Sequence, residues 1–310
     1  MLSAYRRGVL GIAGLGPVER LLTRHGWRLG VGRFVAGETA PAALPALEHL
    51  RASGREVIVD VLGEYVRDPA AAAAMAAEVA AAIDTLTKAG VPAVMSLKPT
   101  QVGLALGEDV AAEHVLALAH KAEAAGGRLA LDMEDARYVD GTLRLLHSTW
   151  QGGALRTSGV LQAYLRRTPD DLEAMLAAAP DPNALELRVV KGAYAERPEL
   201  LLPDMPAIRR AFVALVERAW RAGARVNVAT HDEGLLAEAA AFARGAALPP
   251  EKVEYQLIYG VKPRLQQALA AAGHPVRIYV PVGRDWYGYF SRRLAERPAN
   301  LGVVLRGLAG

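Results

Sequence analysis

The chain has 310 residues, of which 52% are hydrophobic and 22% are charged, and its mean hydropathy is +0.14. This composition excludes global disorder, because a chain of this length and apolar content can bury a large core. The formal charge of +3 is small and the arginines are scattered, which argues against a dedicated nucleic-acid-binding protein. Cysteine is absent, so disulfides, thiolate metal sites, a cysteine nucleophile and a cysteinyl-linked cofactor are excluded.

The first fifty residues have a mostly helical pattern. Arg6 and Arg7 precede an apolar run, but this run is short and glycine-rich and lacks the small-residue cleavage pattern of a signal peptide. The longest uncharged apolar stretches, 8–18 and 69–77, are shorter than the ~20 residues that cross a bilayer. We therefore expect no transmembrane helix, and a helical N-terminal arm over residues 1–52 whose arginines form a solvated face, with contact to lipid or to a partner subunit as the alternative.

Beyond the arm, short β-branched, apolar runs alternate with longer stretches of helical period. The alternation occurs eight times at a spacing of about 31 residues, the size of a strand plus its crossover helix. The expected strands cover residues 57–62, 93–97, 128–131, 159–165, 185–190, 225–229, 253–259 and 276–280. The clearest expected helices cover residues 70–89, 110–125, 170–179, 206–222, 262–272 and 285–297.

Continuous apolar runs are typical of strands that are buried on both faces, as in a parallel sheet covered by helices. Eight such units without an inserted domain favour a closed barrel, and a doubly wound open sheet is the main alternative. We predict an α/β fold in which a (β/α)8 TIM barrel over residues 53–310 follows the helical arm over residues 1–52.

Polar side chains follow the expected strands, at the end where barrels of this type build their sites. They are Glu64, Lys98, Asp132, Gln162, Tyr164, Arg188, Lys191, Thr230, His231, Gln256 and Tyr279. A structural barrel needs no such ring, because buried charges are costly unless they are paired or used. Structural roles remain open for single members: a strand-end Lys or Arg can be a solvated rim residue, and Asp132 can accept backbone hydrogen bonds. Nearby, Asp232 can be no more than the cap of a helix.

Three common chemistries have little support in this sequence. No strand carries two histidines at metal-ligand spacing, and no His-Glu-x-x-His helix is present. The Gly-x-Ser-x-Gly elbow of serine hydrolases is absent. The glycine pairs at 14–16 and 30–32 lack the third glycine and the preceding strand of a Rossmann motif, so a nucleotide cofactor must be held in another way.

The last expected helix begins with aromatic residues and then places Arg292 and Arg293 within two turns. Adjacent helical residues point about 100° apart, so both can reach one carboxylate or phosphate only if the helix overhangs the barrel mouth. The aromatic residues argue against a solvated face and favour that placement. Glu64 is a candidate counter-ion for one arginine when the site is empty. The candidate gating residues are Glu64, Tyr289 and Glu296.

Several short segments occur together in one order along the chain. They are Leu-Lys at 97–98, Leu-Asp-Met-Glu-Asp at 131–135, Leu-Gln-Ala-Tyr at 161–164, Leu-Arg-Val-Val-Lys-Gly-Ala-Tyr at 187–194, Ala-Thr-His at 229–231, Tyr-Val-Pro-Val-Gly at 279–283 and Tyr-Phe-Ser-Arg-Arg-Leu-Ala-Glu at 289–296. Each segment is weak alone, but the ordered set is specific. From about residue 55 to its C-terminus, the chain resembles the short, stand-alone bacterial proline dehydrogenases.

The resemblance implies a distorted (β/α)8 barrel that holds FAD non-covalently and oxidises L-proline to Δ1-pyrroline-5-carboxylate. A hydride would move from proline C5 to flavin N5, and the electrons would pass to a membrane quinone. The chain has no room for the fused modules of bifunctional relatives, so a separate pyrroline-5-carboxylate dehydrogenase would complete proline catabolism to glutamate. The enzyme would be cytoplasmic, or peripheral at the inner face of the cell membrane.

The resemblance also implies residue roles. Asp132 and Arg188 would be catalytic, with Arg188 near flavin N5 and Asp132 setting the charge of Lys98, because opposite charges hold each other ionised. Relatives usually have Leu where this chain has Ile258, and we expect little effect because the volume is conserved. The substrate-binding residues would be Lys98, Ile258, Tyr279, Arg292 and Arg293. The cofactor-binding residues would be Met133, Gln162, Arg188, Lys191, Gly192, Ala193, Thr230 and His231.

Two alternatives from other functional classes remain open. A Schiff-base lyase of the aldolase type would use Lys191 or Lys98 as its nucleophile, and borohydride trapping with a carbonyl substrate would detect it. A small-molecule binding barrel would be colourless and would bind an amino acid without turning it over. The order of the motifs favours the flavin-dependent oxidation of proline over both.

Overall fold

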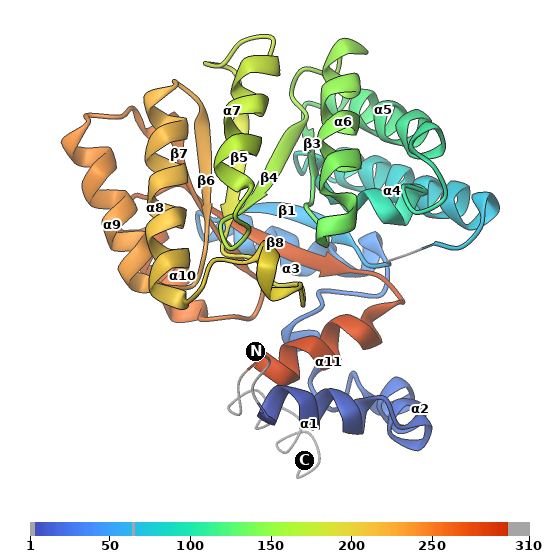
Figure 1. Ribbon diagram of the computed structural model, residues 1–310. Coiled ribbons are helices and arrows are strands. Elements are labelled where there is room, and N and C mark those ends of the chain that lie inside the picture. The colour runs from blue at the N-terminus through green and yellow to red at the C-terminus, as the bar shows by residue number, and fades with distance from the viewer. Residues whose placement is uncertain (1–3, 64–65, 297–310) are drawn as a thin grey trace.

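Eight parallel strands form a closed barrel in chain order in the computed structural model, which describes residues 4–63 and 66–296 (Figure 1). The strands are β1 (Glu56–Val61), β2 (Val94–Leu97), β3 (Arg128–Leu131), β4 (Ser158–Gln162), β5 (Glu186–Val190), β6 (Arg225–Ala229), β7 (Val253–Ile258) and β8 (Val276–Val282). Pairing of β8 with β1 closes the ring, with Ile58 opposite Tyr279. The predicted (β/α)8 barrel is confirmed, and the open sheet is excluded.

The strands match the predicted runs to within three residues, with the largest difference at β4. We predicted a strand over 159–165, but β4 ends at Gln162. Leu165 then makes an isolated antiparallel bridge to Leu201, so the apolar residues after Gln162 pack in a turn instead of extending the barrel strand. A continuous apolar run does not reveal where the backbone leaves the barrel wall.

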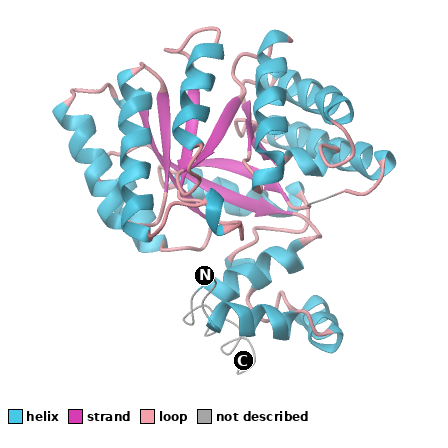
Figure 2. Ribbon diagram, viewed as in Figure 1, coloured by secondary structure: helices cyan, strands magenta, loops and turns pink. Residues whose placement is uncertain are grey.

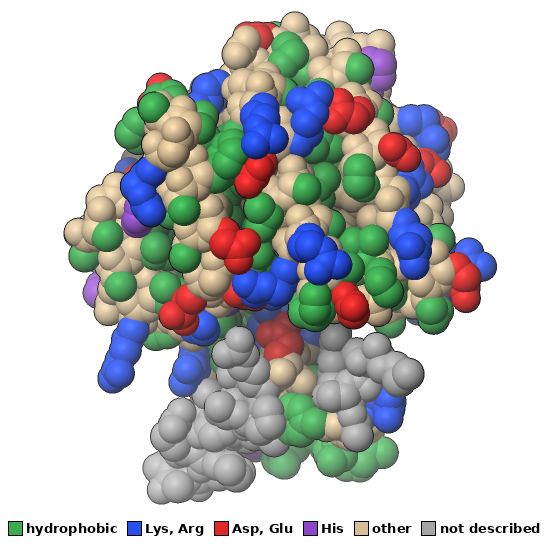
Figure 3. All heavy atoms as spheres, turned by 60° about the vertical axis from the view of Figure 1, so that its left-hand side comes forward, with side chains coloured by type: hydrophobic (Ala, Val, Ile, Leu, Met, Phe, Trp, Pro, Cys, Tyr) green, Lys and Arg blue, Asp and Glu red, His purple; other side chains and the backbone are tan. Residues whose placement is uncertain are grey.

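Helices surround the strands on the outside (Figure 2). They are α4 (Pro69–Lys88), α5 (Glu108–Ala124), α6 (Val139–Gln151), α7 (Thr168–Ala178), α8 (Met205–Arg221), α9 (Glu233–Gly245) and α10 (Pro263–Ala271). Side-chain caps fix several starts: Asp68 accepts a hydrogen bond from Ala71 N, and Asp204 accepts one from Ala207 N, each at 2.8 Å. On the face seen in Figure 3, acidic and basic side chains are interspersed over the helices, a pattern typical of a solvated surface.

One described helix, α4, is long and apolar enough to cross a membrane by length and composition alone. It nevertheless lies on the barrel, and Ala72, Val79, Ile83 and Leu86 on its inner face are at most 1% exposed. It packs between β1, α3 (Ala40–Ala52) and α5. Its apolar composition is therefore explained by the barrel core.

The N-terminal helices divide between two cores. Helix α3 contributes Ala43, Leu47 and Leu50 to the main barrel core. By contrast, α1 (Ala4–Ala13) and α2 (Gly16–His25) pack against α11 (Trp286–Glu296), and these three helices lie together beyond the barrel (Figure 1). A second apolar cluster joins this region to Leu62, which directly follows β1, with Ile258 at the end of β7 packed against it. Helix α11 thus lies beside the carboxyl ends of the strands.

The exposed face of the arm carries both arginines and apolar side chains. Arg20, Arg24 and Arg28 are exposed there, but so are Ile12 and Leu21, at 59% and 55%. Packing of α1 and α2 on α11 uses one face of each helix and leaves apolar side chains on the other.

A buried ion network fills the barrel interior at the amino ends of the strands. Glu254 accepts hydrogen bonds from Arg277 Nε at 2.8 Å and Arg225 Nη2 at 2.6 Å. Gln256, predicted to belong to the ring at the opposite end, donates to Glu254 at 2.8 Å and belongs to this network instead. Burial opposes ionisation of Glu254, but the three arginines around it outweigh burial and lower its pKa to about 2. This end of a barrel stabilises the fold and does not form the site.

We expect Glu254→Gln to lower the free energy of unfolding by about 3 kcal/mol at neutral pH, because buried arginines lose their counter-charge. Since the pKa of Glu254 in the fold is about 2, below its ordinary value of 4.5, its ionisation stabilises the protein above pH 4.5 and that contribution is lost as the pH falls toward 2. Urea titrations should therefore show that the difference in free energy of unfolding between wild type and variant shrinks as the pH falls from 4.5 toward 2. Glu173→Gln, which breaks an exposed pair with Arg218, is the control.

Candidate active site

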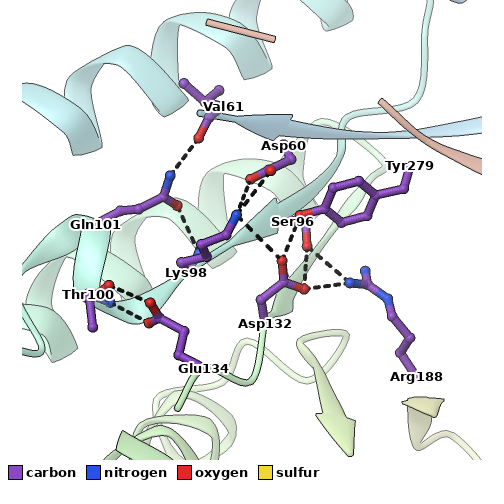
Figure 4. A network of polar contacts seen from close by, with 10 residues as sticks. All are labelled: Asp60, Val61, Ser96, Lys98, Thr100, Gln101, Asp132, Glu134, Arg188 and Tyr279. Carbon is purple, nitrogen blue, oxygen red and sulfur yellow. Dashed lines mark hydrogen bonds and ion pairs between the residues drawn. The ribbon is translucent and has the colours of Figure 1, made fainter. Parts of the chain in front are cut away.

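Asp132, directly after β3, lies at the centre of a polar network at the carboxyl ends of the strands (Figure 4). Its Oδ1 accepts hydrogen bonds from Ser96 Oγ at 2.8 Å and Arg188 Nη1 at 2.5 Å. Its Oδ2 accepts one from the Tyr279 hydroxyl at 2.7 Å. These donors come from β2, β5 and β8, so one carboxylate joins residues from four parts of the barrel.

The surroundings fix the charges of this network. Burial opposes ionisation of Asp132, but Arg188, Lys98 and the hydrogen bonds from Tyr279 and Ser96 outweigh it and lower the pKa of Asp132. Burial and the neighbouring carboxylates raise the pKa of Tyr279 well above its ordinary value, so this hydroxyl stays a neutral donor. The guanidinium carbon of Arg188 lies 5.4 Å from the centre of the Tyr279 ring. The site therefore holds a carboxylate and a cation in fixed positions.

Lys98 has a closer partner than the one we predicted. Its Nζ lies 3.0 Å from both carboxylate oxygens of Asp60, but 3.9 Å from Asp132. Asp60, within β1, is only 1% exposed, and its pKa is raised by burial, which Lys98 opposes. Asp60 was not among the predicted site residues, because those lie at strand ends whereas Asp60 lies inside an apolar run. The available signal was an acidic residue placed between the run Val-Ile-Val at 57–59 and Val61.

A second set of buried contacts fixes the backbone beneath these side chains (Figure 4). Both oxygens of Glu134 bind Thr100, one its backbone N–H at 2.9 Å and the other its hydroxyl at 2.5 Å. The backbone oxygen of Glu134 accepts from Gln162 Nε2 at 2.8 Å. Gln101 accepts from Lys98 N at 2.8 Å and donates to the last carbonyl of β1. We had predicted Gln162 and Lys98, but missed Thr100, Gln101 and Glu134, which hold them.

The loop after β5 begins with Lys191, Gly192 and Ala193. Lys191 Nζ lies 3.3 Å from Asp232, which also pairs with Arg209 and accepts from Leu235 N as the cap of α9. Burial opposes ionisation of Asp232, but Arg209, the cap and Lys191 outweigh it and lower its pKa to about 2. Asp232 is thus the helix cap that we considered, and in addition it pairs with Lys191.

Gly192 is required by both its backbone angle and its neighbour. Its φ is +110°, which disfavours any side chain, and a Cβ there would collide with the ring of Tyr164. We expect Gly192→Ala to lower the free energy of unfolding by about 2 kcal/mol and to weaken binding of any cofactor that this loop contacts. Gly54→Ala is the control, because Gly54 also has positive φ, +75°, but faces open space. Equal effects of the two substitutions would contradict the predicted collision.

The remaining predicted cofactor residues follow β3 and β6. His231 Nε2 accepts a hydrogen bond from Ile258 N at 3.0 Å, and its backbone oxygen accepts one from Lys262 at 3.0 Å. Thr230 is buried and accepts from the backbone N–H of Asp232. Met133 is buried in an apolar cluster with Tyr164. The side chains of His231 and Met133 therefore lie in fixed positions at the rim.

Helix α11 brings Tyr289 and Arg293 toward the mouth. The guanidinium carbon of Arg293 lies 5.2 Å from the Tyr289 ring centre, and its Nη2 lies 2.5 Å from Glu296. Burial raises the pKa of Tyr289 to about 12, and Asp60 and Lys98 are close enough to influence it. Arg292 is half-buried on the same helix. Glu64, the predicted counter-ion, lies outside the described residues, and within them Glu296 pairs with Arg293.

Two polar atoms of the Arg188 side chain are left unpaired by the described residues around them. Arg188 is 4% exposed, and its Nε and Nη2 are buried with no hydrogen-bond partner among the residues the structure describes. Buried guanidinium donors without acceptors are costly, so these two atoms need a ligand with acceptor atoms. Two unsatisfied donors of Arg188 therefore lie buried beside the Asp132 network.

Comparison with known proteins places the chain. A family model described as proline dehydrogenase matches residues 43–306. The chain belongs to the proline dehydrogenase family. It is 36% identical over 308 residues to proline dehydrogenase of Deinococcus radiodurans, a match that covers 98% of this chain and 97% of that protein. It is also 36% identical over 284 residues to proline dehydrogenase 1 of Bacillus subtilis strain 168, covering 92% of each.

Solved structures support the fold of this proline dehydrogenase family member. Proline utilization A from Bdellovibrio bacteriovorus, inactivated by N-propargylglycine, aligns with a TM-score of 0.80 at 20% identity. The alignment covers 90% of this chain and 33% of that protein, so the chain spans about one third of its length. The predicted family is confirmed, and with it an oxidoreductase that acts on the CH–NH group of proline.

Proposed function

We propose that the protein oxidises L-proline to Δ1-pyrroline-5-carboxylate with non-covalently bound FAD. The observation that carries the proposal is the Asp132 network, which fixes Arg188, with its two unsatisfied donors, beside Tyr279 and Lys98. Arg188 would thus face a ligand that is rich in hydrogen-bond acceptors, and Lys98 would lie near the arginines of α11. A small zwitterion and a flavin ring system are the ligands that such a pair of sites fits.

The residues at the mouth fit FAD. Arg188 supplies buried donors for a ring edge, and Gly192 lets the backbone approach closely, because a Cβ there would meet Tyr164. Lys191 would bind the phosphates in place of Asp232, and Met133, Gln162, Ala193, Thr230 and His231 would complete the cofactor site. When bound, FAD would accept a hydride at N5 from C5 of proline. A covalent cysteinyl link is excluded because the chain has no cysteine.

The substrate would lie between β1, β2, β8 and α11. Lys98, Arg292 and Arg293 would bind the proline carboxylate, since a guanidinium can form two parallel hydrogen bonds to one carboxylate. Tyr279 and Ile258 would pack on the ring. Hydride loss requires a neutral amine held in a near-attack geometry. Asp132 already accepts three hydrogen bonds, so its role is to hold Arg188 and Tyr279 in position, and not to accept the amine proton.

Arg293 pairs with Glu296 and lies on the Tyr289 ring, so these contacts would have to change when a substrate carboxylate arrives. We propose that exchange of Glu296 for the substrate gates the site, with Tyr289 as the surface on which the guanidinium moves. Glu64 is a further candidate in this exchange.

The electrons would leave to a membrane quinone, and the product would pass to a separate pyrroline-5-carboxylate dehydrogenase, as a step of proline catabolism to glutamate. A cytoplasmic enzyme that meets the inner face of the membrane peripherally fits this scheme. The Schiff-base alternative is weakened, because Lys98 is held between two carboxylates and a Schiff-base lysine must act as a neutral amine.

The test is a steady-state assay with FAD-loaded protein, L-proline and a soluble quinone analogue. The proposal predicts proline-dependent reduction of the quinone with an equal amount of pyrroline-5-carboxylate, detected by mass spectrometry. Bound FAD without product would contradict the assigned reaction. A lysine adduct trapped by borohydride with a carbonyl substrate would support the lyase instead.

A further inference from the structure

We propose that Asp60 is a positioning residue that keeps two ion pairs of the mouth separate. One pair is Asp60 with Lys98, on the substrate side. The other is Asp132 with Arg188, on the cofactor side. The inference rests on the proposed function, and concerns a buried acid whose ion pair is with Lys98 and which also faces the hydroxyl of Tyr279. It assigns a task to a buried acid that the proposed reaction does not otherwise use.

The distances support this division. Lys98 Nζ lies 3.0 Å from both oxygens of Asp60 and 3.9 Å from Asp132 Oδ2, so a small shift of the ammonium would change its partner. Asp132 in turn holds Arg188 at 2.5 Å through its other oxygen. Two acids and two bases therefore form two adjacent pairs within this described network. Asp60 stabilises the pairing in which Asp132 belongs to Arg188.

The strand geometry makes Asp60 a fixed anchor. Asp60 is paired in register with Ser96 on β2 and with Pro281 on β8, so it lies in the barrel wall between two neighbours. Its side chain is 1% exposed, whereas that of Lys98 is 12% exposed. The acid is therefore held by the wall, and the lysine reaches from it toward the mouth.

Removal of the Asp60 charge should change carboxylate binding in opposite directions, depending on whether Asp60 positions Lys98 or acts only through its electric field. Loss of a negative charge makes the mouth more positive, which by itself would tighten the binding of a carboxylate. A positioning role predicts weaker binding, because Lys98 would move to Asp132. That move would also weaken the hold of Asp132 on Arg188 and leave more positive charge near the flavin, which raises the flavin midpoint potential.

The experiment uses the FAD-loaded protein and cyclopentanecarboxylate, a ring carboxylate without the amine. For Asp60→Asn we expect about 10-fold weaker binding by calorimetry and a more positive flavin midpoint potential. Asp171→Asn is the control: Asp171, on α7, is also buried, at 6% exposed, but pairs with Arg167, which directly precedes that helix. It should change neither quantity. Binding by Asp60→Asn as tight as, or tighter than, that of wild type would overturn the proposal.

A second comparison works even if Asp60→Asn does not fold. The double variant Asp60→Asn with Lys98→Met removes both charges of the Asp60–Lys98 pair, so neither is left buried and unpaired. Its binding is compared with that of Lys98→Met alone. Because Asp60 acts on binding through Lys98, the double variant should bind cyclopentanecarboxylate no more weakly than Lys98→Met alone, and 10-fold weaker binding by the double variant would overturn the proposal. A wild-type protein that binds this probe but is not reduced by proline would overturn the proposed function alone.

Discussion

Asp132→Asn is expected to lower kcat for proline oxidation by about 10²-fold, the range for removing one preorganised electrostatic contact. Asparagine keeps the shape of the side chain but loses the negative charge that holds Arg188 at 2.5 Å. Arg188 would then be a buried cation with one weaker acceptor. The free energy of unfolding should fall by about 3 kcal/mol for the same reason.

The two effects of Asp132→Asn are measured separately, by single-turnover kinetics and by urea unfolding. Asp135→Asn is the matched control, because Asp135 lies three residues further along the same loop and pairs with the exposed Arg137. That variant should retain its turnover and its stability within about 0.5 kcal/mol. A kcat of Asp132→Asn equal to that of wild type would show that the network has only a structural role.

Arg293→Met is expected to raise the KM for proline by about 10²-fold, equivalent to about 3 kcal/mol, and to leave FAD binding largely unchanged. The reason is the position of Arg293: it lies on α11 against the ring of Tyr289, and Lys98 is close enough to influence the same tyrosine. Methionine keeps the apolar stem and removes only the guanidinium.

Arg284→Met provides the comparison, since Arg284 is exposed just before α11. Steady-state kinetics would give KM and kcat, and the ratio of flavin to protein absorbance would give FAD content. Loss of FAD from Arg293→Met at unchanged KM would place this arginine in the cofactor site instead of the substrate site.

The sequence was sufficient for the barrel because its strands are continuous β-branched runs at regular spacing. It also pointed to Asp132, Arg188 and Tyr279, which the structure joins by direct hydrogen bonds. It could not assign Gln256, because only barrel closure decides which layer of the interior an inward side chain enters. Gln256 bonds to Glu254 in the lower layer, although it lies just two residues before the end of β7.

The missed residues share a physical reason. Asp60 and Ser96 lie within strands, where an apolar pattern hides a single polar side chain, and their partners come from other strands. Glu134 binds Thr100, 34 residues away in the chain. Such contacts depend on parallel register, which brings the end of β2 beside the end of β3, and no local pattern records that register.

The central claim is that this mouth holds FAD and that L-proline reduces it. The most direct test is the visible spectrum of the purified, FAD-reconstituted protein under anaerobic conditions, before and after addition of L-proline. We predict an oxidised-flavin spectrum that loses its absorbance on addition of L-proline. A yellow protein whose spectrum does not change with proline, or a protein that cannot be reconstituted with FAD, would contradict the account.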